Sequence, residues 1–456
     1  MRRTWEFNDQ YTVRASYFVS FTLALCWVCM QRYNWLAGMD IFPSTDAYYY
    51  LTEFKARLSE TALPHYERAS LFFTLASFVG RVLGLTPEAL YIGVFGVGYG
   101  ALSVSLLRFV MVHRCPFWGM ASLFLLFESD TIFYRQFAFL AQGFSMSLWG
   151  SGVLLIESEK RVAIKRIGFL VLCCASLLHL FTLCLTVVYF LFRWRSKSWW
   201  SLAIRVGVLL IGAAGLESFS NRAIFASTDF SWGWGLYDAC IFRQCSFREW
   251  ADALLFSLTI LLLLVPRHAL TRGALVLSGI VVLLNLPIWT VGGHMSYRLA
   301  LSSAWIGFML ILMLGAREHV MNWRQRLGLV TGSVVFALLC LVTAPTQYGA
   351  PSGPVLDIRR HATTLLEWLP PRSVLVAKHG LQYQAAYFLE RYATSDLSEA
   401  AQSGAVVTLR PSSRVDRRKC PAITDKAYRS STCISLPSGW LLEILPNNFP
   451  MSESSA

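Results

Sequence analysis

Charged residues are scarce in this sequence. Only 15% of its 456 residues are Asp, Glu, Lys or Arg, whereas soluble domains carry about 25%, and 55% are hydrophobic. Acidic residues are the scarcer sign, with 27 Asp and Glu against 40 Lys and Arg. Because a hydrophobic excess of this size cannot be buried in one soluble core, the composition excludes an ordinary soluble domain and indicates a membrane protein.

Other absences narrow the class further. No A-x-A cleavage site follows the first apolar run, Ala15–Met30, so we expect this run to remain as a signal anchor. The chain has no internal repeat and no low-complexity tract. Its net charge of +13 comes from basic residues that lie mostly between apolar runs or in the tail, which argues against nucleic-acid binding.

Apolar runs recur along the chain, and most approach the roughly 17–25 residues that cross about 30 Å of hydrocarbon. We read the following as spans: Ala15–Met30, Ala138–Ile156, Trp199–Leu216, Ala253–Pro266, Gly273–Pro287, Leu299–Ala316 and Leu327–Ala344. Short cytoplasmic loops are enriched in Lys and Arg, so the basic clusters between the runs predict which loops face the cytoplasm.

The stretch Ile167–Phe192 decides the topology, because it is a single apolar run between two basic clusters. One helix would place one of these clusters outside. Two segments of about 13 residues that meet near His179 keep both clusters inside, but each is roughly 20 Å long, too short to span alone. Broken helices are tolerated where they line a protein-enclosed cavity, and we favour the pair. The chain then has about eleven spans, with the N-terminus inside and the C-terminus outside.

The fold class is therefore an α-helical polytopic membrane protein, with the spans in residues 1–344 and a small extracytoplasmic α/β domain in residues 345–456. Compact loops and the absence of eukaryotic retention signals favour a bacterial inner membrane with a periplasmic tail. Cysteines pair closely in the predicted outer segments, as Cys240 with Cys245 and Cys420 with Cys433, which indicates disulfides. The expected tail elements are helices over Leu356–Leu369 and Tyr383–Tyr392 and strands over Ser373–Ala377, Ala405–Leu409 and Trp440–Leu445.

Two outer loops carry carboxylates next to predicted spans. The first loop holds Asp40 and Asp46, and Asp46 precedes an aromatic run that we expect to begin a helix. The second loop holds Glu128 and Asp130, whose i, i+2 spacing can present both carboxylates to one hard cation. Two structural roles compete with these functional ones. Asp46 could cap the following helix, and Asp130 could pair with Arg135 one turn away.

Both loops resemble one enzyme family. The string Asp46-Ala-Tyr-Tyr-Tyr-Leu51 resembles the Asp-Ala-Tyr-Tyr element of oligosaccharyltransferase-like enzymes, and Glu128-Ser-Asp130 resembles their E-x-D motif. The whole chain is similar in layout to a GT-C glycosyltransferase, with many spans, an acidic first outer loop and an outward C-terminal domain. The resemblance implies an inverting transfer of a sugar from a polyprenyl-phosphate or polyprenyl-diphosphate donor, in contact with membrane lipids.

The resemblance also implies roles for residues. Asp46 would be the general base, and Glu128 and Asp130 would hold a divalent cation, Mg²⁺ or Mn²⁺. Positive charge is needed at the donor phosphate, and the candidates for binding it are Arg298, Arg135 and His294. Asp40 and His179 are lower-ranked site residues.

Structural roles also compete at three of these positions. Arg298 could snorkel into lipid headgroups, His294 could be an ordinary exposed turn residue, and His179 could be a buried, hydrogen-bonded histidine.

The acceptor is left open by the sequence. The tail lacks the W-W-D-Y-G element that recognises the Asn sequon in oligosaccharyltransferases, so transfer to sequon Asn is not expected. A protein such as a pilin, a glycolipid or a polysaccharide could serve. Two other functions compete: a non-catalytic membrane component or transporter of a polysaccharide pathway, and a glycan polymerase that holds two lipid-linked substrates with outer arginines.

The predicted helix pair determines the orientation of the following segments. A reporter fused after Trp199 should read cytoplasmic, and one fused after Ser352 should read periplasmic, because the pair returns the chain to its starting side. Reporter fusions in a bacterial host measure both positions. A periplasmic signal after Trp199 would contradict the pair.

Overall fold

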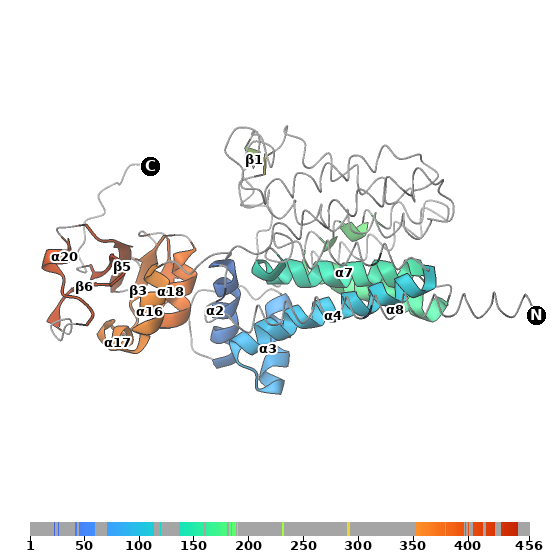
Figure 1. Cartoon of the computed structure of the whole chain (residues 1–456), viewed down its shortest axis with the longest axis horizontal. Helices are drawn as coiled ribbons and strands as arrows, with labels where there is room; N and C mark the ends of the chain where they lie inside the picture. The colour runs from blue at the N-terminus through green and yellow to red at the C-terminus, as the bar shows by residue number, and fades with distance from the viewer. Residues whose placement is uncertain are drawn as a thin grey trace, which may run out of the picture. The chain divides into compact units, whose positions relative to one another are not determined.

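The computed structural model describes part of the chain: residues 45–59, 71–113, 136–158, 161–179, most of 182–189, 353–378, 380–395, 405–413, 416–424, 430–445 and a few isolated positions. The chain divides into two compact units. The first comprises Met1–Gly38, Ser70–Phe72 and Gly93–Thr346, and the second comprises Met39–Ala69, Phe73–Ile92 and Gln347–Ala456. The second unit thus combines the tail with the predicted first outer loop, while the division at residues 344 and 345 stays a prediction. The described elements are the coloured ribbons in Figure 1.

The N-terminal half of the described chain is helical. Its elements are α2 (Thr45–Ser59), α3 (Leu71–Leu83), α4 (Pro87–His113), α7 (Leu140–Ser158) and α8 (Val162–Leu178). Within the described ranges, α4 is the one helix long and apolar enough to cross a membrane, and α3 is a shorter apolar helix. At 27 residues α4 is about 40 Å long. The predicted run Ala138–Ile156 is confirmed as a helix, α7, and the number of spans stays a prediction.

Helices α7 and α8 pack side by side in the first unit, as Figure 1 shows. A Cβ atom added to Gly152 would lie 2.7 Å from Leu172 Cγ and 2.8 Å from the Gly168 carbonyl oxygen. A Cβ added to Gly168 would lie 2.9 Å from the Gly152 carbonyl oxygen. Small residues allow helix backbones to approach closely in membranes, and these two glycines provide that contact here.

The predicted break at His179 is confirmed. Helix α8 ends at Leu178, His179 is extended, and the described residues from Thr182 onward are helical again. The Thr182 hydroxyl donates to the carbonyl of His179 at 2.6 Å, and the Ser176 hydroxyl donates to Thr186 Oγ1 at 2.7 Å. Ten residues span about 15 Å along a straight helix, so the chain must turn back for the second bond to form. The first segment is longer than predicted because its helix begins inside the basic cluster.

A short two-stranded ladder joins two distant segments. Strand β1 (Phe230–Ser231) pairs antiparallel with β2 (Thr290–Val291). These two stretches of the chain therefore lie next to one another.

The tail forms an α/β domain, as predicted. Its sheet has the order β4-β3-β5-β7-β6, with β3 parallel to β4 and β5, and β7 antiparallel to β5 and β6. Leu375, Val407 and Leu442 are completely buried on neighbouring strands and form the centre of the core. Its elements are α16 (Gly353–Arg360), α17 (Ala362–Trp368), β3 (Val374–Ala377), α18 (Leu381–Leu389), β4 (Tyr392–Thr394), β5 (Val406–Pro411), α20 (Asp416–Lys419), β6 (Cys433–Ser435) and β7 (Trp440–Ile444).

The tail differs from the sequence prediction in three ways. The helix expected over Tyr383–Tyr392 begins at Leu381 and ends at Leu389, and Tyr392 belongs to strand β4 instead. The helix expected over Leu356–Leu369 is interrupted at His361, whose backbone leaves the helical region, so that α16 and α17 form instead. Strands β4 and β6 were not predicted. The buried Asp357 of α16 accepts the Ser438 amide at 2.6 Å, which joins the first helix to the turn before β7.

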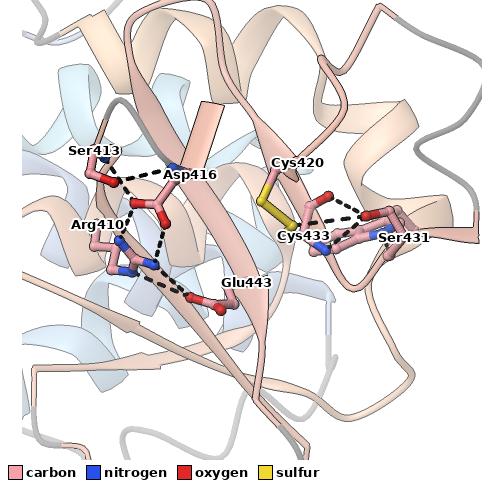
Figure 2. The surroundings of a disulfide bond; sticks show 8 residues. Arg410, Ser413, Asp416, Cys420, Ser431, Cys433 and Glu443 are labelled. Atoms are coloured by element: carbon pink, nitrogen blue, oxygen red, sulfur yellow. Dashed lines mark hydrogen bonds and ion pairs between the residues drawn. A yellow bond between two sulfur atoms is a disulfide. The ribbon is translucent and has the colours of Figure 1, made fainter. Parts of the chain in front are cut away.

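The predicted disulfide between Cys420 and Cys433 is confirmed (Figure 2), with the two Cα atoms 5.3 Å apart. It joins the end of α20 to the start of β6. Ser431 contacts Cys433 through its hydroxyl, and its carbonyl accepts the indole N–H of Trp368 at 2.9 Å. The disulfide segment is therefore also bonded to α17. The other predicted pair, Cys240 with Cys245, lies outside the described residues.

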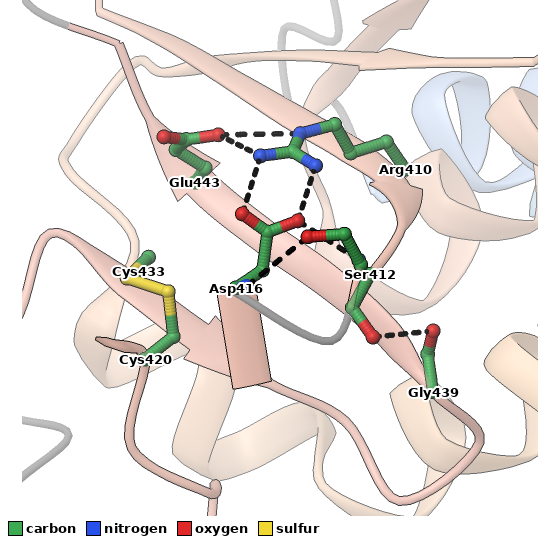
Figure 3. A network of polar contacts seen from close by, with 8 residues as sticks. Arg410, Ser412, Asp416, Cys420, Cys433, Gly439 and Glu443 are labelled. Atoms are coloured by element: carbon green, nitrogen blue, oxygen red, sulfur yellow. Dashed lines mark hydrogen bonds and ion pairs between the residues drawn. A yellow bond between two sulfur atoms is a disulfide. The ribbon is translucent and has the colours of Figure 1, made fainter. Parts of the chain in front are cut away.

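An ion network lies beside the disulfide (Figure 3). The Arg410 guanidinium donates to Asp416 Oδ2 and to Glu443 Oε2, each at 2.9 Å. The Ser413 amide also donates to Asp416, and the Asp416 amide donates back to the Ser413 hydroxyl, a reciprocal cap at the start of α20. Arg410 first, and then Ser413, hold the pKa of Asp416 well below its usual range. The network holds α20, which directly precedes Cys420, and so helps to place Cys420 next to Cys433.

We expect the Cys420–Cys433 disulfide to form in the exported protein. Non-reducing mass mapping of alkylated protein should find the two cysteines in one linked peptide, while Cys173 and Cys174, which are free, carry the alkyl label. The double substitution of both paired cysteines by Ala should destabilise the tail by about 3 kcal/mol, the value expected for a loop of this size. An alkylated Cys420 in unreduced protein would contradict the assignment and weaken the outward placement of the tail.

Candidate functional site

Helix α2 presents the predicted base, Asp46. The helix begins at Thr45, so Asp46 occupies its first turn, where a negative charge is stabilised by the helix dipole, and Arg57 occupies its last turn. Asp46 is half-buried, whereas the next two residues, Ala47 and Tyr48, are buried. The expected helix after the acidic loop is confirmed, and Asp46 lies inside it rather than at the capping position.

One face of α2 packs against the neighbouring helices α3 and α4. Leu51 and Phe54 are completely buried, and the ring of Phe54 lies 5.7 Å from that of Phe73. Gly80 of α3 allows both helices to come close, because a Cβ there would lie 2.8 Å from Leu90 Cδ2 of α4 and 3.1 Å from Leu58 Cδ2 of α2. Within α2 itself, the buried Glu53 forms an ion pair with Arg57, one turn further along the helix, at 3.1 Å. This packing holds α2 along its length from one side.

A second face of α2 packs against α18 of the tail domain. The Thr52 hydroxyl donates to the Tyr383 carbonyl at 3.3 Å, and the Lys55 ammonium donates to the Tyr387 carbonyl at 3.1 Å. Lys55 also forms an ion pair with Glu390 at 2.9 Å. These contacts join residues more than 330 positions apart in the sequence.

Aromatic rings fill the space between these polar contacts. Tyr48 of α2 lies 5.5 Å from the ring of Tyr387 and 5.5 Å from that of Phe388. Tyr49, the next residue of α2, lies 5.5 Å from Tyr383, edge to face. Each such pair stabilises by roughly 0.5–1.5 kcal/mol beyond the buried area. The helix that bears the candidate base is thus packed on two sides.

The tyrosines of this junction are poor acids. Burial raises the pKa values of Tyr48 and Tyr387 well above their usual range, and in Tyr387 the hydrogen bond to Glu88 adds to the effect. Burial also raises the pKa of Tyr383, with a smaller contribution from the charge of Asp46. The phenols therefore remain protonated at neutral pH, and the carboxylate of Asp46 lies close enough to Tyr383 to act on it electrostatically.

The other predicted site residues are distributed differently. His179 lies in the first unit, where its carbonyl accepts the Leu183 amide at 3.1 Å and so takes part in the helix break. Asp46 belongs to the second unit. The remaining predicted positions lie outside the described residues: Asp40, Glu128, Asp130, Arg135, His294 and Arg298. Within the described ranges, no three His, Cys, Asp or Glu side chains are grouped to hold a metal ion.

The residues that hold α2 were not predicted from the sequence. Glu88 opens α4 and accepts the hydroxyl of Tyr387, and Lys55 and Glu390 pair across the junction. A local signal existed for α2: Tyr48, Thr52 and Lys55 are spaced by four and three residues, which places them on one helix face. Nothing local to either segment indicates that this face meets α18.

Comparisons with known proteins identify the fold. No family model matches the chain, and no curated protein matches its sequence. Among solved structures, ArnT from Cupriavidus metallidurans bound to undecaprenyl phosphate is similar, with a TM-score of 0.55, 12% identity, and coverage of 96% of this chain and 99% of that one. The apo state of the same protein has the same identity and coverage and a TM-score of 0.44.

The likeness to the lipid-bound structure shows the fold alone, because the identity is low. The likeness extends over nearly the whole of both chains. This chain accordingly shares the overall fold of ArnT.

Proposed function

We propose that this protein is an inverting glycosyltransferase of GT-C type that moves a sugar from a polyprenyl-linked donor to an acceptor on the periplasmic side of a bacterial inner membrane. The observation that carries the proposal is the shared fold with ArnT, whose structure holds undecaprenyl phosphate. The acidic loop motifs support it independently, since fold alone does not determine function. The donor would be a polyprenyl phosphate or diphosphate sugar, and the acceptor a protein, a glycolipid or a polysaccharide.

Asp46 performs the proton transfer in this proposal. Its carboxylate accepts the proton of an acceptor hydroxyl while the hydroxyl oxygen attacks the anomeric carbon of the sugar. The bond from that carbon to the phosphate oxygen breaks, the polyprenyl phosphate or diphosphate leaves, and the anomeric configuration inverts. A half-buried carboxylate on a rigid helix suits this task, because it stays accessible while its position is fixed.

Positive charge must offset the charge that develops on the leaving phosphate. Arg298, Arg135 and His294 are the side chains proposed to contact the phosphate, and Arg298 offers a planar fork that matches phosphate oxygens. Glu128 and Asp130 are proposed to hold Mg²⁺ or Mn²⁺, which supplies further positive charge when bound. Asp40 and His179 are proposed as secondary contributors.

Replacing Asp46 by Asn tests the base. The substitution preserves size and much of the polar bonding but removes the group that accepts the proton, so we expect transfer to fall by about 10²–10⁴-fold. The assay follows labelled sugar from a polyprenyl-linked donor pool in membranes, normalised to the amount of folded protein. Asp40→Asn, earlier in the same loop, is the matched control and should lose much less activity.

The competing structural role gives a different result in the same assay. If the Asp46 charge only stabilises the first turn of α2, Asp46→Asn should cost about 0.3–1 kcal/mol of stability and leave turnover per folded molecule intact. Full turnover in Asp46→Asn would therefore remove the base assignment. Absence of transfer by the unmodified protein with every polyprenyl-linked donor would contradict the proposed function itself and favour a transporter or other non-catalytic component.

The proposed cation site has its own test. Glu128→Gln and Asp130→Asn should each weaken transfer, and added Mn²⁺ should partly restore it, because a site that lost one carboxylate needs a higher ion concentration for occupancy. A Mn²⁺ titration of transfer in each variant measures the shift. Transfer that resists chelators and is unchanged in both variants would show that these carboxylates do not hold a required ion.

A further inference from the structure

The contact between α2 and α18 is a continuous strip along one face of each helix. On α2 it comprises Tyr48, Thr52 and Lys55, which follow one another at the spacing of successive helical turns. On α18 it comprises Tyr383 and Tyr387, which are likewise one turn apart. Polar bonds and ring contacts alternate along the strip. A strip of this kind fixes both the axial position and the rotation of α2.

Tyr387 is the residue where three elements meet. Its ring lies 5.5 Å from Tyr48, its carbonyl accepts Lys55, and the Lys55 ammonium lies 4.9 Å from its ring centroid. Its hydroxyl donates to Glu88 in the first turn of α4. Only 8% of Tyr387 is exposed. One side chain of the tail domain thus bonds to the start of α4 while it packs against α2.

Glu390 completes the strip at the end of α18. It adopts a left-handed backbone conformation, with φ of 48°, which is strained for a residue other than glycine. Its carboxylate nevertheless forms the ion pair with Lys55. A glycine would fit this backbone without cost but could not form the pair.

Asp46 lies at the other end of the same helix. It precedes Tyr48 by two residues, or about 3 Å of helix rise, so any rotation or shift of α2 against α18 moves its carboxylate directly. A misplacement of about 1 Å at a reacting group can cost about 10²-fold in rate. The positions of Tyr48 and Lys55 therefore bear on the chemistry at Asp46, although neither side chain performs it.

We propose that Tyr387 is a positioning residue for the transfer reaction: its bond to Glu88 and its packing against α2 hold Asp46 in place. This inference rests on the proposed function, because it takes Asp46 as the base. It assigns the tail domain a part in catalysis that is separate from acceptor recognition. The hydroxyl–carboxylate bond is the link that can be removed with least change to the packing.

Two kinds of variant separate positioning from stability. Tyr387→Phe removes the hydroxyl and keeps the ring, and Glu88→Ala removes its acceptor. Glu88→Gln keeps an acceptor oxygen and should restore most of the activity that Glu88→Ala loses. Tyr392→Phe, a tyrosine of β4 in the same domain, is the matched control for loss of a phenol hydroxyl.

Two readouts are measured on the full-length protein in detergent or membranes. The first is kcat and KM for the donor, per folded molecule. The second is backbone hydrogen exchange of residues 45–59, which reports on α2 without any substrate. We expect Tyr387→Phe to lower kcat by roughly 10- to 100-fold with little change in donor KM, and to speed exchange in α2. Because Tyr387→Phe and Glu88→Ala break the same bond, the double variant should be no worse than either single one.

The outcomes distinguish this inference from the proposed function. Unchanged exchange in α2, or normal kcat in Tyr387→Phe and Glu88→Ala while Asp46→Asn is inactive, would overturn the positioning role and leave the glycosyltransferase proposal standing. Equal losses in Tyr392→Phe would reduce the effect to general instability and overturn it as well. If the unmodified protein transfers no sugar, the proposed function fails, and the positioning role for transfer fails with it.

Discussion

The packing of α2 against α18 is the contact on which the account of this protein depends. The carboxylate proposed to accept a proton must be held at a fixed place, and the contacts of α2 with its neighbours determine that place. Here Lys55 and Thr52 bond to carbonyl oxygens of a helix more than 330 residues away, and tyrosine rings fill the space between them. The tail domain therefore supports the helix of the predicted first outer loop, and the two belong to one compact unit.

A sheet, a disulfide and an ion network stabilise the tail domain itself. Its five-stranded sheet supplies a buried core, and α18 connects the parallel strands β3 and β4. The Cys420–Cys433 disulfide and the Arg410 network fix the far loops of the domain. Helix α18 can position α2 only if α18 itself is held rigidly, and these features hold it. In the first unit, Gly152 and Gly168 allow α7 and α8 to pack closely.

Local patterns in the sequence predicted much of this architecture. The helix after Asp46, the break at His179, the strands β3, β5 and β7, and the disulfide all follow from short-range signals: aromatic and apolar spacing, the charge clusters, and cysteine pairing. Strands β4 and β6 were not predicted, because three residues are too few to show the two-residue period of a strand. The break at His361 was not predicted, because the helical spacing of apolar residues continues through it.

The candidate site was predictable only in part, and the reason is physical. Asp46 is marked by its place at the start of an aromatic helix, a local feature. Lys55, Glu88, Tyr387 and Glu390 act through contacts between segments that are distant in sequence, and no spacing rule within one segment indicates its partner. The proposed cation and phosphate residues depend on the same kind of long-range arrangement, and their roles rest on resemblance and charge.

The most direct test of the central claim is a cryo-electron microscopy structure of the full-length protein with a polyprenyl-phosphate analogue. If the protein transfers sugar from such a donor with Asp46 as base, ordered density for the lipid phosphate should lie between Asp46 and Glu128, with α2 held against α18. Lipid phosphate bound elsewhere, with no density between these two carboxylates at saturating analogue, would contradict the account.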